Sequence, residues 1–343
     1  MRIPTLSLAV LALAIPAGAQ TVPDWVTKTK ISGLAFGDAY LVAAHHDPTV
    51  EDQNGVWFRR LYFTVDHKES EQLSVRFRLE GNSVGDFAAL DRNIDTFVKD
   101  IWLQWKYSGS HAAIIGLSSP PTFDWIESYW GYRHVEKTPL DLLRFSPSRD
   151  LGLAFKGAWG NQTKWWYHGM ISNGDDKNPG ERVMGSLRVE PAKAWVIEGY
   201  ADYDNRTDES DVWTIQGFVG LHGDWGRAGG QVARQSRQIS ATQDLKLDLF
   251  SAFVIIALNN DMSILARVDA LFDPNPAGEN IAYFEMSDIA EPLLFLAGID
   301  IPIRDTFSIV PNIEVVSYSN PIGTAPTPDT DIFLKGTFYW TFN

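Results

Sequence analysis

The sequence lacks cysteine altogether, and it lacks long apolar runs. Without cysteine the chain cannot be a disulfide scaffold, although many periplasmic and outer-membrane proteins also have none. After residue 19 no segment reaches the 18 or more consecutive apolar residues of a membrane-spanning helix. The longest candidate, 249–258, is about as long as a strand. A helical membrane anchor is therefore excluded.

Basic residues are scarce relative to acidic ones, with 29 Lys and Arg against 43 Asp and Glu and a net charge of −14. This balance argues against a nucleic-acid partner, which would need a basic footprint. The composition, 45% hydrophobic and 21% charged, resembles that of a water-soluble protein. A membrane β-barrel has a similar average, because its lipid-facing and lumen-facing residues alternate.

The N-terminus predicts a secretory signal peptide over residues 1–19. Met1-Arg2 forms a short positive region, 6–15 is almost entirely apolar, and Ala17-Gly18-Ala19 fits the small-residue cleavage pattern. A first buried helix is the alternative, but the apolar run is too short to span a bilayer and ends in a cleavage pattern. We expect the mature chain, 20–343, to form a single domain.

Alternation of apolar and polar residues is strictest in 73–80. A period of two indicates a strand, because helical spacing would mix both classes on every face. The apolar positions are Leu73, Val75, Phe77 and Leu79, and the polar ones are Ser74, Arg76, Arg78 and Glu80. The stretches 60–66 and 264–272 repeat the pattern.

Comparable segments predict about sixteen strands along the chain, and no long helix. They lie near 31–44, 56–67, 72–81, 96–107, 111–118, 151–159, 163–173, 184–190, 194–204, 212–222, 227–237, 246–258, 262–272, 293–301, 306–317 and 331–342.

The predicted connections alternate between long and short. The long ones are 45–55, 82–95, 119–150, 174–183, 205–211, 238–245, 273–292 and 318–330. The short ones are rich in Gly, Asn, Asp and Pro, as tight turns require. Outer-membrane barrels have short periplasmic turns and long outer loops, whereas a soluble sandwich has no reason to keep this parity.

We therefore predict an all-β fold, a transmembrane antiparallel β-barrel of about sixteen strands in the bacterial outer membrane. The length of the chain agrees with sixteen strands. The 324 mature residues (343 less 19) leave roughly twenty residues for each strand with its connection, and a tilted membrane strand needs about 9–11 residues. A barrel of this size encloses an aqueous channel.

The inward faces of the predicted strands are charged or polar. Any one such charge is most simply a solvated one, but together they predict a wet interior, because burying so many charges would be costly. The candidate pore-lining residues are Arg60, Arg76, Arg78, Glu80, Asp100, Gln104, Lys106, Lys156, Arg188, Glu198, Asp202, Arg267, Asp269 and Lys335.

The connection 119–150 is the longest, and long ordered loops usually have a function. Its aromatic residues suggest that it folds inward and narrows the pore; a lid over the mouth, or a contact with a neighbouring subunit, is the open alternative. The candidate constriction residues are Trp125, Trp130, Arg133, Glu136, Lys137, Asp141 and Arg144.

Four motifs carry a resemblance to a known family. GDAY at 37–40, VWFRRLY at 56–62 and LSVRFRLE at 73–80 resemble the N-terminal part of the phosphate-selective porin O and P family, and SRDLG at 148–152 resembles its entry into the strand after the long loop. The resemblance implies a sixteen-stranded, usually trimeric, outer-membrane channel. We therefore expect a homotrimer that passes small hydrophilic solutes or ions.

Phosphate selectivity does not follow directly from the resemblance. Phosphate-selective members display a dense lumenal ladder of Lys and Arg, whereas this chain is acidic. A general porin, or one that mildly favours cations, fits as well as an anion channel. Aromatic residues of the long loop also leave open a sugar channel with an aromatic slide: Trp125, Tyr129, Trp130 and Tyr132.

An enzyme is a weaker alternative, as is a soluble secreted lectin-like protein. His45-His46-Asp47 draws attention, but no serine or further carboxylate is convincingly placed beside it. A loop metal site or a plain surface loop fits these residues better than a catalytic group. We predict no enzyme and assign no catalytic residue, no metal ligand and no cofactor.

The final strand, 331–342, ends in alternating aromatic residues. Phe338, Trp340 and Phe342 are expected to face lipid at the periplasmic aromatic girdle and to serve as the signal read by the barrel-assembly machinery, with Asn343 following as a departure from the pattern. Lipid and lipopolysaccharide are the other expected partners.

Overall fold

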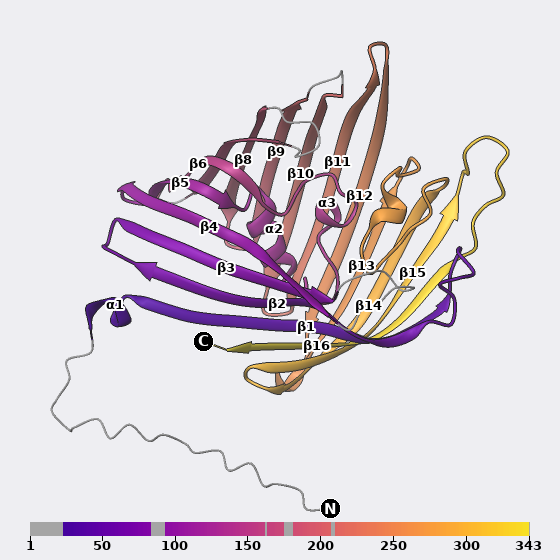
Figure 1. Ribbon diagram of the computed structural model, residues 1–343, viewed down its shortest axis with the longest axis horizontal. Coiled ribbons are helices and arrows are strands. Elements are labelled where there is room, and N and C mark those ends of the chain that lie inside the picture. The colour runs from indigo at the N-terminus through magenta and orange to yellow at the C-terminus, as the bar shows by residue number, and fades with distance from the viewer. Residues whose placement is uncertain (1–22, 84–92, 162, 175–180, 207–209, 343) are drawn as a thin grey trace, which may run out of the picture.

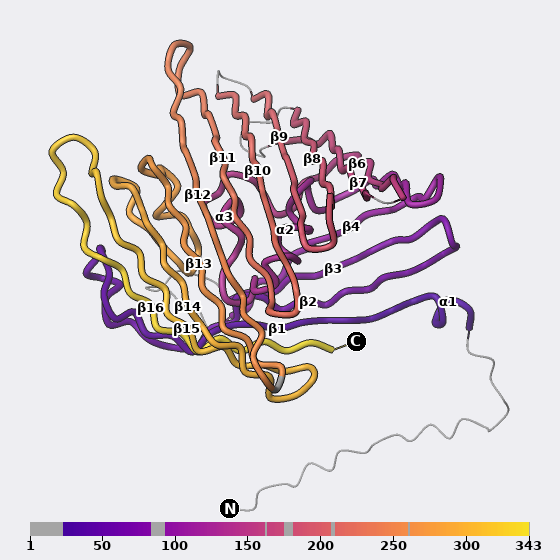
Figure 2. The backbone as a smooth tube through the Cα atoms, turned by 180° about the vertical axis from the view of Figure 1, so that it is seen from behind, coloured from indigo at the N-terminus to yellow at the C-terminus, as the bar shows by residue number. Residues whose placement is uncertain are grey.

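The computed structural model describes residues 23–83, 93–161, 163–174, 181–206 and 210–342. Sixteen strands form one closed antiparallel barrel, in which neighbours in sequence pair with each other and the last strand pairs with the first. Figure 1 shows the wall with helices α2 and α3 on its inner side, and Figure 2 shows it from behind. The predicted barrel is confirmed, while the predicted signal peptide, 1–19, lies outside the described residues.

The strands are β1 (Thr29–Ala44), β2 (Asn54–Lys68), β3 (Leu73–Ser83), β4 (Ile94–Ser108), β5 (His111–Ser118), β6 (Asp150–Trp159), β7 (Lys164–Ser172), β8 (Glu181–Ala192), β9 (Trp195–Asn205), β10 (Val212–Gly223), β11 (Gly226–Ser240), β12 (Gln243–Ala257), β13 (Ser263–Leu271), β14 (Glu291–Arg304), β15 (Phe307–Ser319) and β16 (Asp331–Phe342). The helices are short: α1 (Asp24–Thr27), α2 (Phe123–Trp130), α3 (Pro139–Leu142), η1 (Asn259–Asp261) and η2 (Gly278–Asn280). Among the described residues, no helix is long and apolar enough to cross a membrane.

One predicted connection is wrong. The segment 238–245 is a long loop in the sequence-based prediction, but β11 and β12 extend to Ser240 and Gln243 and leave a two-residue turn. Gln238 pairs with Asp244 across this hairpin, which projects from the wall in Figure 1. Beyond the apolar band both faces of a hairpin meet water, so the alternation of residue types ends before the hydrogen-bonded ladder does.

The two faces of the wall are inverted relative to a water-soluble protein, as β9 shows. Burial alternates along the whole strand. The outward residues Trp195 and Ile197 are 46% and 43% exposed, whereas the inward residues Glu198 and Asp202 are 2% and 6% exposed. An apolar exterior with a polar interior is the pattern of a barrel that stands in lipid.

Two connections pack inside the barrel, 119–149 and 272–290. They contribute to one buried apolar cluster together with inward residues of the wall, so one side of the interior is filled by side chains. The cluster comprises Tyr40, Val42, Val50, Trp57, Leu140, Leu142, Leu143, Phe145, Ala233, Leu247, Leu249, Leu271, Ile281, Tyr283, Phe284, Met286, Leu294, Val316 and Phe333.

β16 closes the barrel by pairing with β15 and β1. Trp340 lies opposite Phe307 of β15 and Ala35 of β1, and it is 44% exposed on the outer face. On the inner face Phe333, Lys335 and Thr337 are buried. The last residues of the chain therefore complete the ladder on both sides, and without them two strands would present unpaired backbone groups.

Deletion of residues 340–343 is expected to abolish insertion of a folded barrel, because unpaired backbone groups in lipid cost several kcal/mol each. Cell fractionation and the heat-modifiable migration of a folded barrel on a denaturing gel would measure this. A matched deletion of four residues in the connection between β15 and β16, 322–325, is the control and should leave insertion intact. If the 340–343 deletion inserted normally, residues 340–343 would not be needed to close the barrel.

Candidate functional site

Two β-bulges point consecutive charged residues into the barrel. On β2, Arg60 pairs with Phe36 and Phe58 pairs with Gly37, so Arg59 is an extra residue and both arginines lie on the inner side. On β4, Asp100 pairs with Arg78 and Val98 pairs with Leu79, so Lys99 is an extra residue and both Lys99 and Asp100 lie on the inner side. A bulge bends its strand and redirects a side chain, as is common near functional sites. Alternation alone would place Arg59 and Lys99 in lipid.

The bulges help to build two ionic trios on the wall formed by β2, β3 and β4. Glu80 lies between Arg60 at 2.8 Å and Lys99 at 3.1 Å. Asp100 lies between Arg78 at 3.0 Å and Arg149, whose Nε contacts its other oxygen. Each trio has two cations and one anion, so the two trios together carry two net positive charges. Arg149 comes from the end of the long loop and also lies 3.9 Å from exposed Asp124.

A third trio lies on the long loop. Arg133 contacts Glu127 at 2.5 Å and Asp141 at 2.7 Å, so this trio carries one net negative charge. Burial raises the pKa of Glu127, although Arg133 acts in the opposite direction. Burial also tends to raise the pKa of Asp141, but Arg133 and Lys137 outweigh it and the pKa is lowered.

The loop is held inside the barrel by side chains of the wall that bind its main chain. Arg59 donates to the carbonyl oxygen of Val135 at 2.8 Å and to that of His134. Arg227 donates to the carbonyl of Tyr129 at 2.6 Å, and Arg267 to the carbonyl of Lys137 at 2.5 Å. Gln235 donates to the carbonyl of Phe145 at 2.7 Å. These donors come from β2, β11 and β13, so they fix the loop across much of the lumen.

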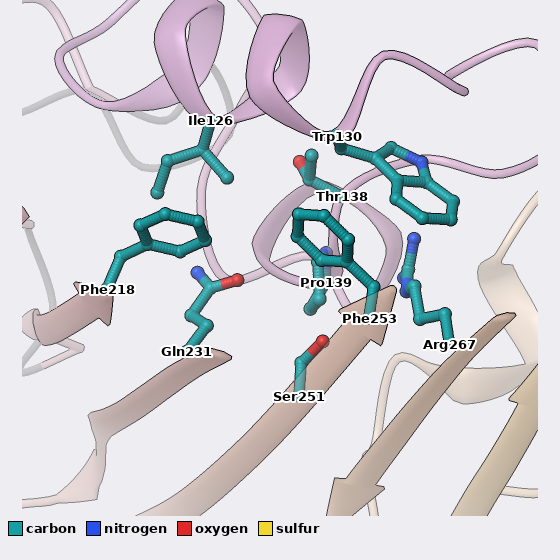
Figure 3. Close-up of a pocket in the computed structure, with 9 residues that line it drawn as sticks. All are labelled: Ile126, Trp130, Thr138, Pro139, Phe218, Gln231, Ser251, Phe253 and Arg267. Carbon is teal, nitrogen blue, oxygen red and sulfur yellow. The ribbon is translucent and has the colours of Figure 1, made fainter. Parts of the chain in front are cut away.

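Apolar packing seals the loop against the wall. Figure 3 shows Ile126 and Trp130 of α2 facing Phe218 and Phe253, which come from β10 and β12. The gap between them is about 10 Å³, which is at the lower limit for a single water molecule. The aromatic residues predicted to turn the loop inward therefore form a packed seam, and Trp130 is 1% exposed.

A buried ionic network lies beneath the loop. Glu136 is 3.5 Å from Arg59 and 4.0 Å from Lys335. Lys335 also contacts Glu314, and Arg59 is 2.8 Å from Asp38. The side chains of these residues are at most 6% exposed, so the network supports the loop and is shielded from the lumen.

All but one of the predicted pore-lining residues fall into three groups. Arg60, Arg78, Glu80 and Asp100 form the wall trios, and Arg76 pairs with Asp66 at 2.7 Å further along the same wall. Arg267, Asp269 and Lys335 point inward but lie under the loop, with side chains at most 3% exposed. Lys106, Lys156 and Arg188 line a cavity of about 380 Å³ between the start of the loop and the wall from β4 to β9, together with Gln104 and Glu198. Asp202 is buried and forms an ion pair with Arg182 of β8.

Arg188 in this cavity is clamped between two indole rings. Its guanidinium carbon lies 4.5 Å from the ring centre of Trp125 and 4.2 Å from that of Trp166. Among the other predicted loop residues, Arg144 donates to the carbonyl of Asn280 at 3.0 Å and so joins the two inward loops. The sequence analysis missed Arg59, Lys99 and Arg227; the signal for the first two was a charge at a position that alternation assigns to lipid.

No protein-family model and no curated protein matches the chain. Its fold is similar to solved porins. The anion-selective porin from Comamonas acidovorans has a TM-score of 0.67 and 11% identity over 92% of this chain and 99% of that one. OmpF of Salmonella typhi has a TM-score of 0.66 and 10% identity over 92% of this chain and 97% of that one. The trimer form of OmpT of Vibrio cholerae has a TM-score of 0.61 and 11% identity over 92% of this chain and 99% of that one. At these identities the likeness shows a shared porin-type barrel fold, and the phosphate-selective family receives no separate support.

The Arg59→Gln variant should lower the free energy of unfolding by roughly 3–5 kcal/mol, because it leaves buried Asp38 and Glu136 with one cation fewer. Urea unfolding of the folded barrel would measure the change. Arg234→Gln is a matched control that removes an exposed arginine 2.6 Å from Asp248 and should have little measurable effect. Equal stabilities of the two variants would contradict the anchoring role.

His134 makes the docked loop sensitive to acid. Burial and then the charge of Arg59 lower the pKa of His134 from its ordinary 6.5 to about 3. Between these values the unfolded chain binds a proton that the folded one does not, so stability is present above pH 6.5 and is lost as the pH falls. At pH 4 the loss should reach about 3 kcal/mol.

The variant His134→Phe keeps an aromatic ring against Tyr339, which stacks on His134 at 4.4 Å between ring centres. Urea unfolding of both proteins at pH 7 and pH 4 should show a smaller acid-induced loss in the variant. Identical losses would contradict the assignment, since carboxylates titrate equally in both proteins.

Proposed function

We propose that the chain forms a water-filled channel in the bacterial outer membrane for passive diffusion of small hydrophilic solutes and ions. The observation that carries this proposal is the charged loop held inside an apolar-faced barrel. The charges of the Arg133 trio on the loop and of the Glu80 and Asp100 trios on the wall would act on permeating ions. Glu80 and Asp100 are themselves buried, and the side chains of their cations are 10–17% exposed. The predicted signal peptide and the outward apolar residues of β9 support the location.

The charges around the loop favour a mild preference for anions. The wall trios carry two net positive charges and the loop trio one net negative charge. Opposed charges set a field across a passage and filter ions by sign. The three trios together carry one net positive charge, although the whole chain is at −14. Phosphate is one small anion that such a channel would pass, and an anion-selective porin shares the fold.

A homotrimer and the lipid partners belong to the same proposal. OmpT of Vibrio cholerae, which shares the fold, has been solved in a trimer form. Outward aromatic and aliphatic side chains would contact lipid and lipopolysaccharide, and the C-terminal strand would be read by the barrel-assembly machinery. The sugar channel is less favoured, because Arg188 covers a face of both Trp125 and Trp166, on which a sugar ring would stack.

Planar-bilayer recording of the purified protein in a KCl gradient tests the proposal. We expect stable conductance and a reversal potential of the sign that indicates anion preference. Arg78→Gln should move the reversal potential toward cation preference, because it removes one of the wall cations beside Asp100. Glu127→Gln should move it toward stronger anion preference, because it removes a loop anion.

The variant Arg234→Gln is the control, since Arg234 lies exposed and outside the three trios. It should leave the reversal potential unchanged. Absence of conductance would refute the channel. Shifts of the reversal potential in the same direction for the two trio variants, or each in the direction contrary to the one expected, would refute the assigned filter. Reduction of the chloride current by added phosphate would show that phosphate enters the same passage.

A further inference from the structure

The two histidines that follow β1 meet a carboxylate from the far end of the chain. The sequence suggests Asp47 as their partner, but its Oδ1 accepts a hydrogen bond from the Thr49 backbone N–H at 2.8 Å. The carboxylate beside them belongs to Asp331, the first residue of β16. Its Oδ1 accepts from the His46 backbone N–H at 2.6 Å, and Nδ1 of His46 lies 2.9 and 3.0 Å from its two oxygens.

His45 completes a compact group of three donors. One potential ligand atom each from His45, His46 and Asp331 lies within 4.8 Å of the others, and within the described part of the chain this is the one group of its kind. The two imidazole rings stack at 4.3 Å between centres. His45 and Asp331 are 3% and 0% exposed, so the donors are held in place and largely shielded from competing water.

We propose that His45, His46 and Asp331 bind one divalent transition-metal ion of the zinc class. Two imidazoles and one carboxylate are typical ligands of Zn²⁺, whereas Ca²⁺ and Mg²⁺ prefer sites made of oxygen atoms alone. Three protein ligands leave a fourth position for water in a tetrahedral site.

The His46–Asp331 pair needs only a small adjustment to accept the ion, whereas the ligand atom of His45, which lies within 4.8 Å of the other two, would move closer to them. Zn–N and Zn–O bonds of about 2.0–2.2 Å at a tetrahedral angle separate nitrogen and oxygen by about 3.4 Å. His46 Nδ1 and the Asp331 oxygens are at 2.9 and 3.0 Å, so the ion would replace the proton that these two groups share and widen the pair by about half an ångström. The hydroxyl of Tyr318 donates a hydrogen bond to Asp331 and would hold that carboxylate in its orientation toward the ion.

The ion would connect the first and last strands of the barrel. His45 and His46 follow the last residue of β1, Ala44, while Asp331 begins β16, which pairs with β1 to close the barrel. Binding to the folded state alone would stabilise this seam in proportion to ion concentration. The site is independent of the channel's selectivity, because neither the wall trios nor the loop trio contributes a ligand.

Isothermal titration of untagged, folded protein with Zn²⁺ is the test, together with metal analysis after dialysis. We expect one ion per chain. His46→Gln and Asp331→Asn should each weaken binding at least about tenfold, the lower end of the loss known even for partners outside the ligand set. His67→Gln is the matched control, because it removes a histidine that lies 3.1 Å from Glu69 in a separate pair. It should leave binding unchanged.

A second measurement keeps the variants interpretable. Heat-modifiable migration would establish that each variant is folded, and Zn²⁺ should raise the temperature of its loss in the wild type and in His67→Gln but not in the two ligand variants. If Asp331→Asn does not fold, the binding measured for His46→Gln tests the site. The side-chain amide of that variant can still donate a hydrogen bond to Asp331, so we expect it to fold. Absence of stoichiometric binding by the wild type, or equal binding by folded His46→Gln, would overturn the site whatever the bilayer recordings show.

Discussion

The closed ladder of backbone hydrogen bonds is the constraint on which the rest of the structure depends. Lipid offers no partner for a peptide group, so a sheet can stand in it only without an edge. Pairing of β1 with β16 removes the last edge and fixes the strand number at sixteen. Closure also separates two environments, which is why residues such as Trp195 face outward while Glu198 faces inward.

This separation explains how much could be predicted from the sequence. A strand between lipid and water alternates residue by residue, so all sixteen strands were found from the period of two. The prediction failed where that contrast ends, at 238–245, because a hairpin in water has no apolar face to mark it. It also failed at Arg59 and Lys99, where one extra residue shifts the alternation and turns a second charge inward.

The site was less predictable than the fold, because it depends on contacts between distant segments. The aromatic content of 119–150 indicated a packed loop, but not which donors hold it. Its carbonyl groups accept hydrogen bonds from Arg59, Arg227 and Arg267, which lie 75 to 130 residues away along the chain. The sequence also could not predict that Arg267 and Lys335 would lie under the loop. Alternation predicts that a charged side chain points inward, but not whether water or a loop covers it.

For the proposed channel, the position of a charge matters more than the total charge of the chain. An overall charge of −14 argues for cations if it is taken as an average. Coulomb interactions decline with distance and are screened in water within about 8 Å at physiological salt, so distant acidic residues act weakly on an ion inside the barrel. The groups that would act on it are the trios of Glu80, Asp100 and Arg133, whose sum is positive. The bulge at Lys99 supplies one of those cations, so a local departure from regular strand geometry contributes directly to the sign of the field.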